Sequence, residues 1–163
     1  MNLVPIKDYE NYSLDLNNNQ VYTHKYKRYL KPDLNNTGYY QIKLNKNNKQ
    51  KTFKLHRLIY ESHFGSIPEG MCIDHIDNNP QNNNIENLRL ATLSQNSWNS
   101  KTPTNNLSTG YKNITKTKSN TYRVKIKKNN KIVYHKTFKT LEEAILNRDV
   151  NLVLHHSEFH NLG

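Results

Sequence analysis

The stretch Gly70-Met-Cys-Ile-Asp-His-Ile-Asp-Asn-Asn-Pro80 decides the fold of the region around it. Its short apolar run ends in an acid–imidazole pair, Asp74 and His75, so we expect a strand that ends at this pair. A polar, Asn-rich loop then leads to Asn87-Leu-Arg89, where a second short strand is expected. The order strand, long loop, strand follows.

A helix is predicted to begin directly after this second strand. Thr92 and Gln95 have the spacing of a capping box, in which the hydroxyl and the amide side chain satisfy free backbone N–H groups. Asn96 then lies one turn inside the helix. On this layout we expect Asp74 and His75 to lie near Asn96.

These three side chains have complementary chemistry. A carboxylate and an amide oxygen suit a hard divalent cation, and an imidazole, which titrates near neutral pH, is a natural base for a water molecule. A metal ion beside a base, in a basic chain, is typical of phosphodiester hydrolysis. Because neighbouring residues of a regular strand face opposite sides, Asp74 and His75 can share a site only where the strand ends or twists.

The pattern Asp74-His75-x11-Asn87-x8-Asn96 resembles the HNH nuclease motif of the ββα-metal kind, in the form where Asn replaces the last His. It looks most like phage and intron-encoded HNH homing endonucleases. The resemblance implies that His75 is the general base and that Asp74 and Asn96 are the metal ligands. It implies that Asn87 ties the loop down and orients the base, and Mg²⁺ or Mn²⁺ is the expected ion.

Simpler interpretations exist for the separate residues. Asp and Asn side chains bond their own backbone in turns, which explains any one of these residues taken alone. Cys72-x-x-His75 has the spacing of half a zinc site, but further ligands at zinc spacing are missing from the sequence. The four matched positions together favour the nuclease interpretation.

Composition and charge point to a polyanionic partner. The 163 residues are only 34% hydrophobic and carry a net charge of +11, so small modules are more plausible than one large core. Residues 101–141 contain eleven Lys or Arg and no acid, whereas residues 1–65 contain eleven against five acids. A single cysteine and the lack of a signal-like or membrane-spanning segment predict an intracellular protein with no membrane partner.

The first 55 residues read as a small antiparallel β module. Tyr40, Ile42 and Leu44 alternate with polar residues, and Asn47-Asn48 is expected to turn the chain back as a hairpin. A short helix is predicted over residues 56–64, whose His56 and His63 we leave out of the site. The module resembles the β segment that precedes the nuclease core in HNH homing endonucleases, which implies DNA contact by Lys25, Lys27, Arg28 and Lys43.

The C-terminal third reads as three strands and a helix after a linker at residues 101–109. Tyr122, Val124 and Ile126 alternate with cations, Asn129-Asn130 turns the chain, and Thr140-x-x-Glu143 is a second capping box. The predicted helix runs to about residue 156 with a core stripe of Leu141, Ala144, Ile145 and Leu152.

This region resembles the ethylene-responsive-factor (Apetala-type) DNA-binding domain, in which the sheet enters the major groove. The match covers residues 110–159, including Gly110-Tyr-Lys and Lys136-Thr-Phe-Lys. It places Arg123, Lys125 and Lys127 on the DNA-facing strand and Lys112 and Lys116 on the strand before it. The family's usual strand Trp and hairpin Gly are absent here.

The hairpin at residues 40–54 echoes the one at residues 122–139. Tyr40-Gln-Ile-Lys-Leu-Asn-Lys-Asn-Asn-Lys49 parallels Tyr122-Arg-Val-Lys-Ile-Lys-Lys-Asn-Asn-Lys131. Either the two hairpins are related, or basic hairpins that face DNA have converged.

Together these observations predict an α+β protein with four parts: a β module at 1–55, an HNH core at 56–100, a linker at 101–109 and a sheet packed on one helix at 110–163. The predicted function is site-preferring, metal-dependent cleavage of double-stranded DNA by a homing-type enzyme that either nicks one strand or cuts both. A monomer is favoured, and Arg89 is expected to neutralise phosphate charge. A non-cleaving DNA-binding regulator that keeps the HNH scaffold is the alternative, and RNA binding through the basic sheets is a third hypothesis.

Overall fold

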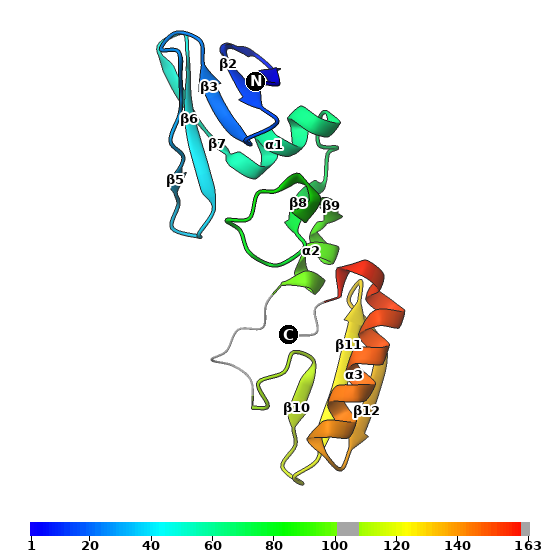
Figure 1. Ribbon diagram of the computed structural model, residues 1–163. Helices are drawn as coiled ribbons and strands as arrows, with labels where there is room; N and C mark the ends of the chain where they lie inside the picture. Colours follow the sequence, from blue (N-terminus) through cyan, green and yellow to red (C-terminus); the bar gives the residue numbers. More distant parts are fainter. Residues whose placement is uncertain (101–107, 161–163) are drawn as a thin grey trace. The chain divides into compact units, whose positions relative to one another are not determined.

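A computed structural model describes residues 1–100 and 108–160 of the chain (Figure 1). The chain divides into two compact units, residues 1–91 and 92–163, and each is described by itself. Within the described residues, no helix is both long and apolar enough to cross a membrane.

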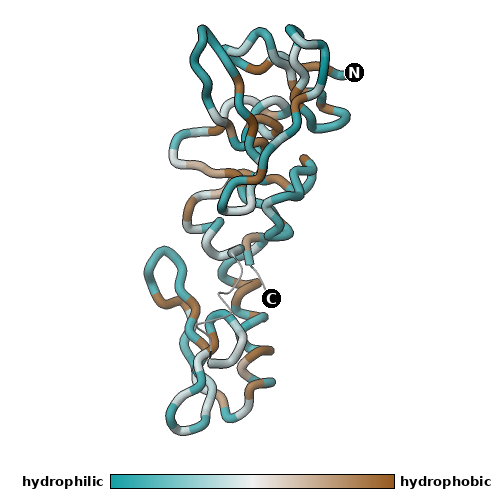
Figure 2. Tube along the Cα trace, turned by 90° about the vertical axis from the view of Figure 1, so that its left-hand side faces the viewer, coloured by the Kyte–Doolittle hydropathy of each residue, from teal (hydrophilic) through white to brown (hydrophobic). Residues whose placement is uncertain are grey.

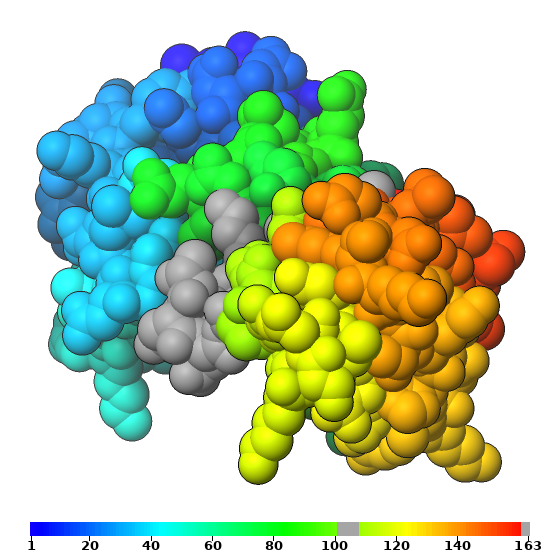
Figure 3. Space-filling view, turned by 90° about the horizontal axis from the view of Figure 1, so that it is seen from below, coloured from blue at the N-terminus to red at the C-terminus, as the bar shows by residue number. Residues whose placement is uncertain are grey.

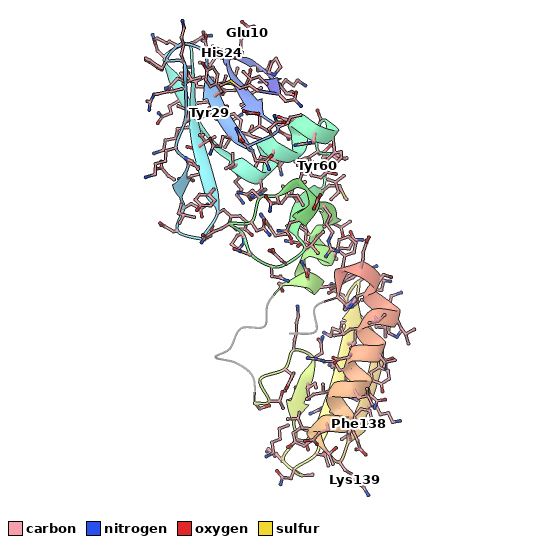
Figure 4. The ribbon with its side chains drawn as sticks, in the orientation of Figure 1. Glu10, His24, Tyr29, Tyr60, Phe138 and Lys139 are labelled. Atoms are coloured by element: carbon pink, nitrogen blue, oxygen red, sulfur yellow. The ribbon has the colours of Figure 1, made fainter. Side chains whose placement is uncertain are left out.

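The first unit opens with a four-stranded antiparallel meander. Its strands, in sheet order, are β1 (Leu3–Ile6), β2 (Tyr9–Asp15), β3 (Gln20–Thr23) and β4 (Arg28–Tyr29). The end of β2 is buried on both faces, and the buried carboxylate of Asp15 is satisfied by hydrogen bonds from the Tyr29 hydroxyl (2.5 Å) and from the backbone N–H of Asn17 (3.1 Å). The bond to Tyr29 (labelled in Figure 4) lowers the pKa of Asp15.

The predicted hairpin follows as the second sheet, formed by β5 (Asp33–Leu34), β6 (Tyr40–Lys46) and β7 (Lys49–Lys54). Asn47 and Asn48 both have positive φ, at 51° and 59°, as a two-residue type I′ turn requires. Helix α1 (Leu55–Phe64) starts at the residue after β7, which confirms the predicted short helix.

The remaining elements of this unit are β8 (Met71–His75), the 3₁₀ turn η1 (Ile85–Asn87) and β9 (Leu88–Thr92). Strands β8 and β9 pair as a two-stranded sheet, which is the predicted order of strand, long loop and strand. One apolar cluster joins the meander, the hairpin, α1 and β8–β9. Its buried members are Ile6, Tyr12, Leu14, Val21, Ile42, Leu44, Leu55, Leu58, Ile59, Ile73 and Leu88.

The second unit begins with α2 (Leu93–Asn99), whose Thr92–Gln95 capping box is formed as predicted. Three antiparallel strands follow, β10 (Ile114–Lys116), β11 (Tyr122–Lys128) and β12 (Lys131–Phe138), and then α3 (Leu141–His156) and η3 (Ser157–Phe159). Helix α3 packs on the sheet, mainly on β11, and begins at the predicted Thr140–Glu143 capping box (Figures 1 and 3).

The core of the second unit is small and contains a charge. Val124, Ile126, Ala144 and Leu152 are buried, and apolar and polar turns alternate along α3 in Figure 2. The predicted core stripe of α3 missed Arg148, which is only 1% exposed. Its guanidinium lies 5.1 Å from the centre of the Tyr111 ring and is ion-paired with the neighbouring Asp149.

The predicted α+β architecture is therefore confirmed: an antiparallel N-terminal β part, the ββα order β8-β9-α2, and a three-stranded sheet packed on one helix. The division at residues 55, 100 and 109 stays a prediction. Most of the predicted linker, residues 101–107, lies outside the described residues.

Candidate functional site

Asp74 and His75 are the last two residues of β8 and both are buried, at 3% and 5% exposure. Their side chains contact different partners, as neighbouring strand residues do. Asp74 Oδ2 accepts a hydrogen bond from Nε of Arg89 on β9 at 2.9 Å, and this ion pair is itself largely buried. The predicted phosphate-binding residue Arg89 thus holds the Asp74 carboxylate in this structure.

His75 is oriented by an asparagine of the following loop. Its Nε2 lies 3.0 Å from Oδ1 of Asn83. An amide oxygen can only accept, so Nε2 is the donor in this contact, and in the tautomer that leaves Nε2 protonated the ring lone pair lies on Nδ1. Asn83 was not singled out from the sequence, where it is one of many asparagines in the loop.

Two further aromatic side chains pack against the His75 ring. The His56 ring, from the start of α1, meets it edge-on with centroids 5.0 Å apart, and Tyr39 lies 5.8 Å away. Burial, reinforced by the nearby His75, lowers the pKa of His56 to about 3. His56 therefore stays neutral near pH 7 and adds no charge beside His75. The sequence-based site left His56 out, yet the structure places its ring against the proposed base.

The loop between β8 and β9 is held by Asn87 and Asp77. The Asn87 amide donates to Asp77 Oδ1 (2.9 Å) and to the carbonyl of Asn82 (2.8 Å), and its oxygen accepts from the Asp77 backbone N–H (3.0 Å). Asn82 donates a further bond to Asp77 Oδ2 at 2.7 Å. Burial raises the pKa of Asp77 and these hydrogen bonds lower it, with a net downward shift. Asn87 thus ties the loop down, whereas its catalytic role stays a prediction.

The other predicted metal ligand, Asn96, lies half-buried on α2 in the second unit. Its pairing with Asp74 at one ion stays a prediction. Among the residues that the structure describes, no group of three or more His, Cys, Asp or Glu side chains forms a metal cluster. The proposed donors, one carboxylate and one amide, are hard oxygen ligands of the kind that Mg²⁺ and Mn²⁺ take, so their chemistry fits the ion.

Most of the predicted DNA-binding cations are exposed on strands or their connections. These are Lys25, Lys27, Arg28 and Lys43 in the first unit and Lys116, Arg123, Lys125 and Lys127 in the second. Lys112 differs from its expected place, because β10 begins only at Ile114. Its ammonium instead binds the end of α2, with oxygens of Ser97, Trp98 and Ser100 within 3.2 Å. Lys112 sits before the strand because the turn at Asn113, with φ of 67°, separates the two.

Comparison with known proteins covers the same region. Residues 53–98 match the model of the HNH endonuclease family. The chain is 39% identical over 87 residues to DNA endonuclease I-HmuI of Bacillus phage SP01, which is 53% of this chain and 50% of that protein. It is 53% identical over 53 residues to Protein 3.8 of Escherichia phage T7, which is 32% of this chain and 44% of that protein.

A solved structure, titled as DNA binding and cleavage by the HNH homing endonuclease I-HmuI, resembles this fold with a TM-score of 0.54 and 38% identity. The likeness covers 60% of this chain and 56% of that one. The chain spans about half or less of the length of the curated relatives that it matches. The chain therefore contains an HNH endonuclease domain, over residues 53–98.

Proposed function

We propose that this protein is a site-preferring DNA endonuclease of the homing type, which hydrolyses phosphodiester bonds with a divalent metal ion and His75 as general base. The observation that carries the proposal is the setting of His75 inside the HNH domain. It is a buried imidazole with Nε2 held by Asn83, next to a carboxylate paired with Arg89.

In this proposal each residue has a separate task. His75 accepts a proton from the attacking water at its ring lone pair, and the Asn83 bond fixes the tautomer that makes this possible. Asn87 keeps the loop that carries Asn83 in place through Asp77 and Asn82. Asp74 and Asn96 would hold Mg²⁺ or Mn²⁺, which when bound neutralises charge on the scissile phosphate and on the leaving 3′ oxygen.

The flanking modules would provide affinity and site preference. Arg123, Lys125 and Lys127 alternate with buried residues on β11, so they stand together on the face of the sheet that α3 does not cover. An Apetala-type module would place this face in the major groove of double-stranded DNA. Lys25, Lys27, Arg28 and Lys43 would add phosphate contacts from the first unit. One site per chain favours nicking by a monomer.

A plasmid assay tests the nuclease proposal. Supercoiled plasmid with AT-rich inserts is incubated with wild type, His75→Ala or the matched control His63→Ala, each with Mg²⁺, Mn²⁺ or EDTA. We expect relaxation by wild type and His63→Ala only when a metal is present. For His75→Ala we expect the relaxation rate to fall by at least about 100-fold, in line with the loss of a general base.

Two results would contradict the proposal. Equal relaxation by His75→Ala would assign the base to another residue. Metal-independent DNA binding without cleavage of any insert would favour the regulator that keeps the HNH scaffold. Circular dichroism of each variant shows whether the fold survives the change.

A further inference from the structure

The C-terminal end of α2 is held by a lysine from the module that follows it. The Lys112 ammonium lies within hydrogen-bond distance of the backbone carbonyls of Ser97 (2.9 Å), Trp98 (3.2 Å) and Ser100 (3.0 Å) and of the Ser100 hydroxyl (3.1 Å), and its three N–H groups donate among these oxygens. The last carbonyls of a helix have no partner inside it, and a cation there also interacts favourably with the helix dipole. Lys112 therefore caps α2.

α2 depends on such interactions because it is only seven residues long. Helices of this length do not persist alone in water. The Thr92–Gln95 capping box satisfies backbone N–H groups at the start of α2, and Lys112 satisfies carbonyl oxygens at its end. Burial between these groups lowers the pKa of Lys112, yet an ammonium that binds several carbonyls can remain charged.

An aromatic stack attaches the same helix to the end of α3. The Trp98 and His156 rings lie face to face, with centroids 4.4 Å apart and an angle of 7° between planes. His156 is only 5% exposed, and its Nε2 contacts the carbonyl of Lys127 on β11 at 3.1 Å. Lys128 places its ammonium 5.7 Å from the Trp98 ring centre. We call Lys112, Trp98, Lys128 and His156 the α2 clamp.

The clamp contacts one face of α2, and Asn96 lies on the opposite face. Two positions along an α-helix turn by about 200°, so Asn96 and Trp98 lie on opposite faces. The face with Trp98 is taken up by His156, and the face with Asn96 points away from that stack. The module that would bind DNA and the helix that would supply a metal ligand are thus joined in one compact unit.

We infer that Lys112 is a positioning residue of the nuclease, which together with the Trp98–His156 stack fixes α2 and its Asn96 on the C-terminal sheet-and-helix module. This inference rests on the proposed function. It replaces the DNA contact expected for Lys112 with a role inside the protein. When this module binds DNA, its position on the DNA then sets the position of the Asn96 side chain relative to the DNA.

Trp98 is the single tryptophan of the chain, so its fluorescence reports directly on the clamp. We compare wild type with Lys112→Met, with the conservative Lys112→Arg and with Lys118→Met, which removes an equal charge from an exposed lysine of the same module. We expect Lys112→Met to shift Trp98 emission to longer wavelength and to increase acrylamide quenching about twofold. Lys112→Arg restores the wild-type signal, and Lys118→Met leaves it unchanged.

Cleavage and DNA binding are measured on the same variants. A displaced ligand helix lowers the cleavage rate at saturating DNA, here by about tenfold, while the DNA affinity stays within about twofold. His156→Leu, which breaks the stack at its other end, gives the same pair of changes if Lys112→Met does not fold.

The outcomes separate the two proposals. Unchanged Trp98 emission in both Lys112→Met and His156→Leu overturns the clamp. Altered emission with an unchanged cleavage rate, where wild type cleaves, overturns the positioning role of Lys112 in the nuclease. A loss of DNA affinity and of its salt dependence, with emission intact, restores Lys112 as a DNA contact. If wild type cleaves no DNA, the nuclease proposal fails, whereas a shifted emission still establishes that Lys112 holds α2.

Discussion

Two hairpins of this chain share one local sequence pattern but pack against different elements. In β6–β7 and in β11–β12, an Asn-Asn pair with positive φ forms the turn, and apolar residues alternate with cations on the strands. In the first hairpin Lys46 pairs with Lys49, and in the second Lys128 pairs with Lys131, so the turn has the same register in both. The shared register follows in each hairpin from the two-residue Asn-Asn turn.

The differences lie in what each hairpin meets. The buried residues of β6 join a core that extends to the meander, α1 and β8, whereas those of β11 meet mainly α3. Lys43 of β6 lies 3.8 Å from the Asp33 carboxylate, while Lys125 of β11 stands opposite His135. A shift in register between Ile126 and Lys127 also marks only the second pair of strands. The same local pattern thus supports a scaffold in one unit and, in the other, a basic face whose cations form no ion pair with the residues that the structure describes.

The largest expected effects come from truncating one buried side chain in each of the two cores. Leu44 and Ile126 are both fully buried, each under its own hairpin. Leu44→Ala and Ile126→Ala should each lower the free energy of unfolding of their own unit by about 2–5 kcal/mol, because apolar burial is reduced and a cavity remains. Residue-resolved hydrogen exchange in low urea checks this. Loss of protection in both units from either change would show that the units unfold together.

Removing charge from the two hairpins should affect DNA binding unequally. Replacing Arg123, Lys125 and Lys127 by Gln should weaken binding about 100-fold at physiological salt and reduce the salt slope of the affinity by about 2.7, which is about 0.9 for each phosphate that is no longer neutralised. Lys43→Gln should change the slope by less than Lys125→Gln, because Asp33 already offsets part of the Lys43 charge.

Fluorescence anisotropy with a labelled duplex at several salt concentrations gives both quantities. Equal changes in slope for Lys43→Gln and Lys125→Gln would remove the functional distinction between the hairpins. An unchanged affinity in the triple variant would reject the β11 face as a DNA surface.

Each unit also buries a histidine beside its hairpin, and this predicts sensitivity to acid. The pKa of His56 is about 3 in the folded protein and near 6.5 when unfolded, so below pH 6.5 the unfolded chain binds more protons. Stability is therefore lost as the pH falls from about 6.5 towards 3, by up to about 1.4 kcal/mol per pH unit, or about 2 kcal/mol at pH 5. Burial shifts the pKa of His156 in the same direction.

Urea unfolding of wild type and His56→Leu at pH 7 and pH 5 measures this effect. The difference in unfolding free energy between the two pH values should shrink in the variant, within the first unit only. A pH dependence that is identical in both proteins would mean that His56 is protonated in the fold or that another group dominates.

The sequence predicted features whose parts lie close together along the chain. The capping boxes at Thr92 and Thr140 formed as expected, because each depends on residues three positions apart. Both Asn-Asn turns formed for the same reason. In the site, the position of Asp74 and His75 at a strand end also followed from a local pattern.

Contacts between distant segments were not predictable in this way. The ring of His56 meets His75 only because α1 packs under β8, and Asn83 is indistinguishable from its asparagine neighbours until the loop is folded. Charged residues are rarely buried on the core-facing side of a helix, so the sequence did not predict Arg148 there. Its burial is stabilised by the Tyr111 ring and by the ion pair with Asp149. The role of Lys112 likewise could not be predicted, because its contact with the end of α2 depends on where α2 lies in the fold.

The smallest expected effect tests the likeness of the hairpins. Asn48 and Asn130 hold the second turn position with φ of 59° and 62°, where Gly is free of steric cost. Asn48→Gly and Asn130→Gly should each raise the free energy of unfolding by about 0.3 kcal/mol, a gain limited by the greater freedom of Gly in the unfolded chain. Asn45→Gly, within β6, is the matched control and should instead destabilise by about 0.5–1 kcal/mol. Because the turn register is shared, the two turn variants should agree within experimental error in urea titrations. Opposite signs would mean that the register shift beside Lys127 strains the second turn, and the two hairpins would then differ in their local chemistry as well as in their partners.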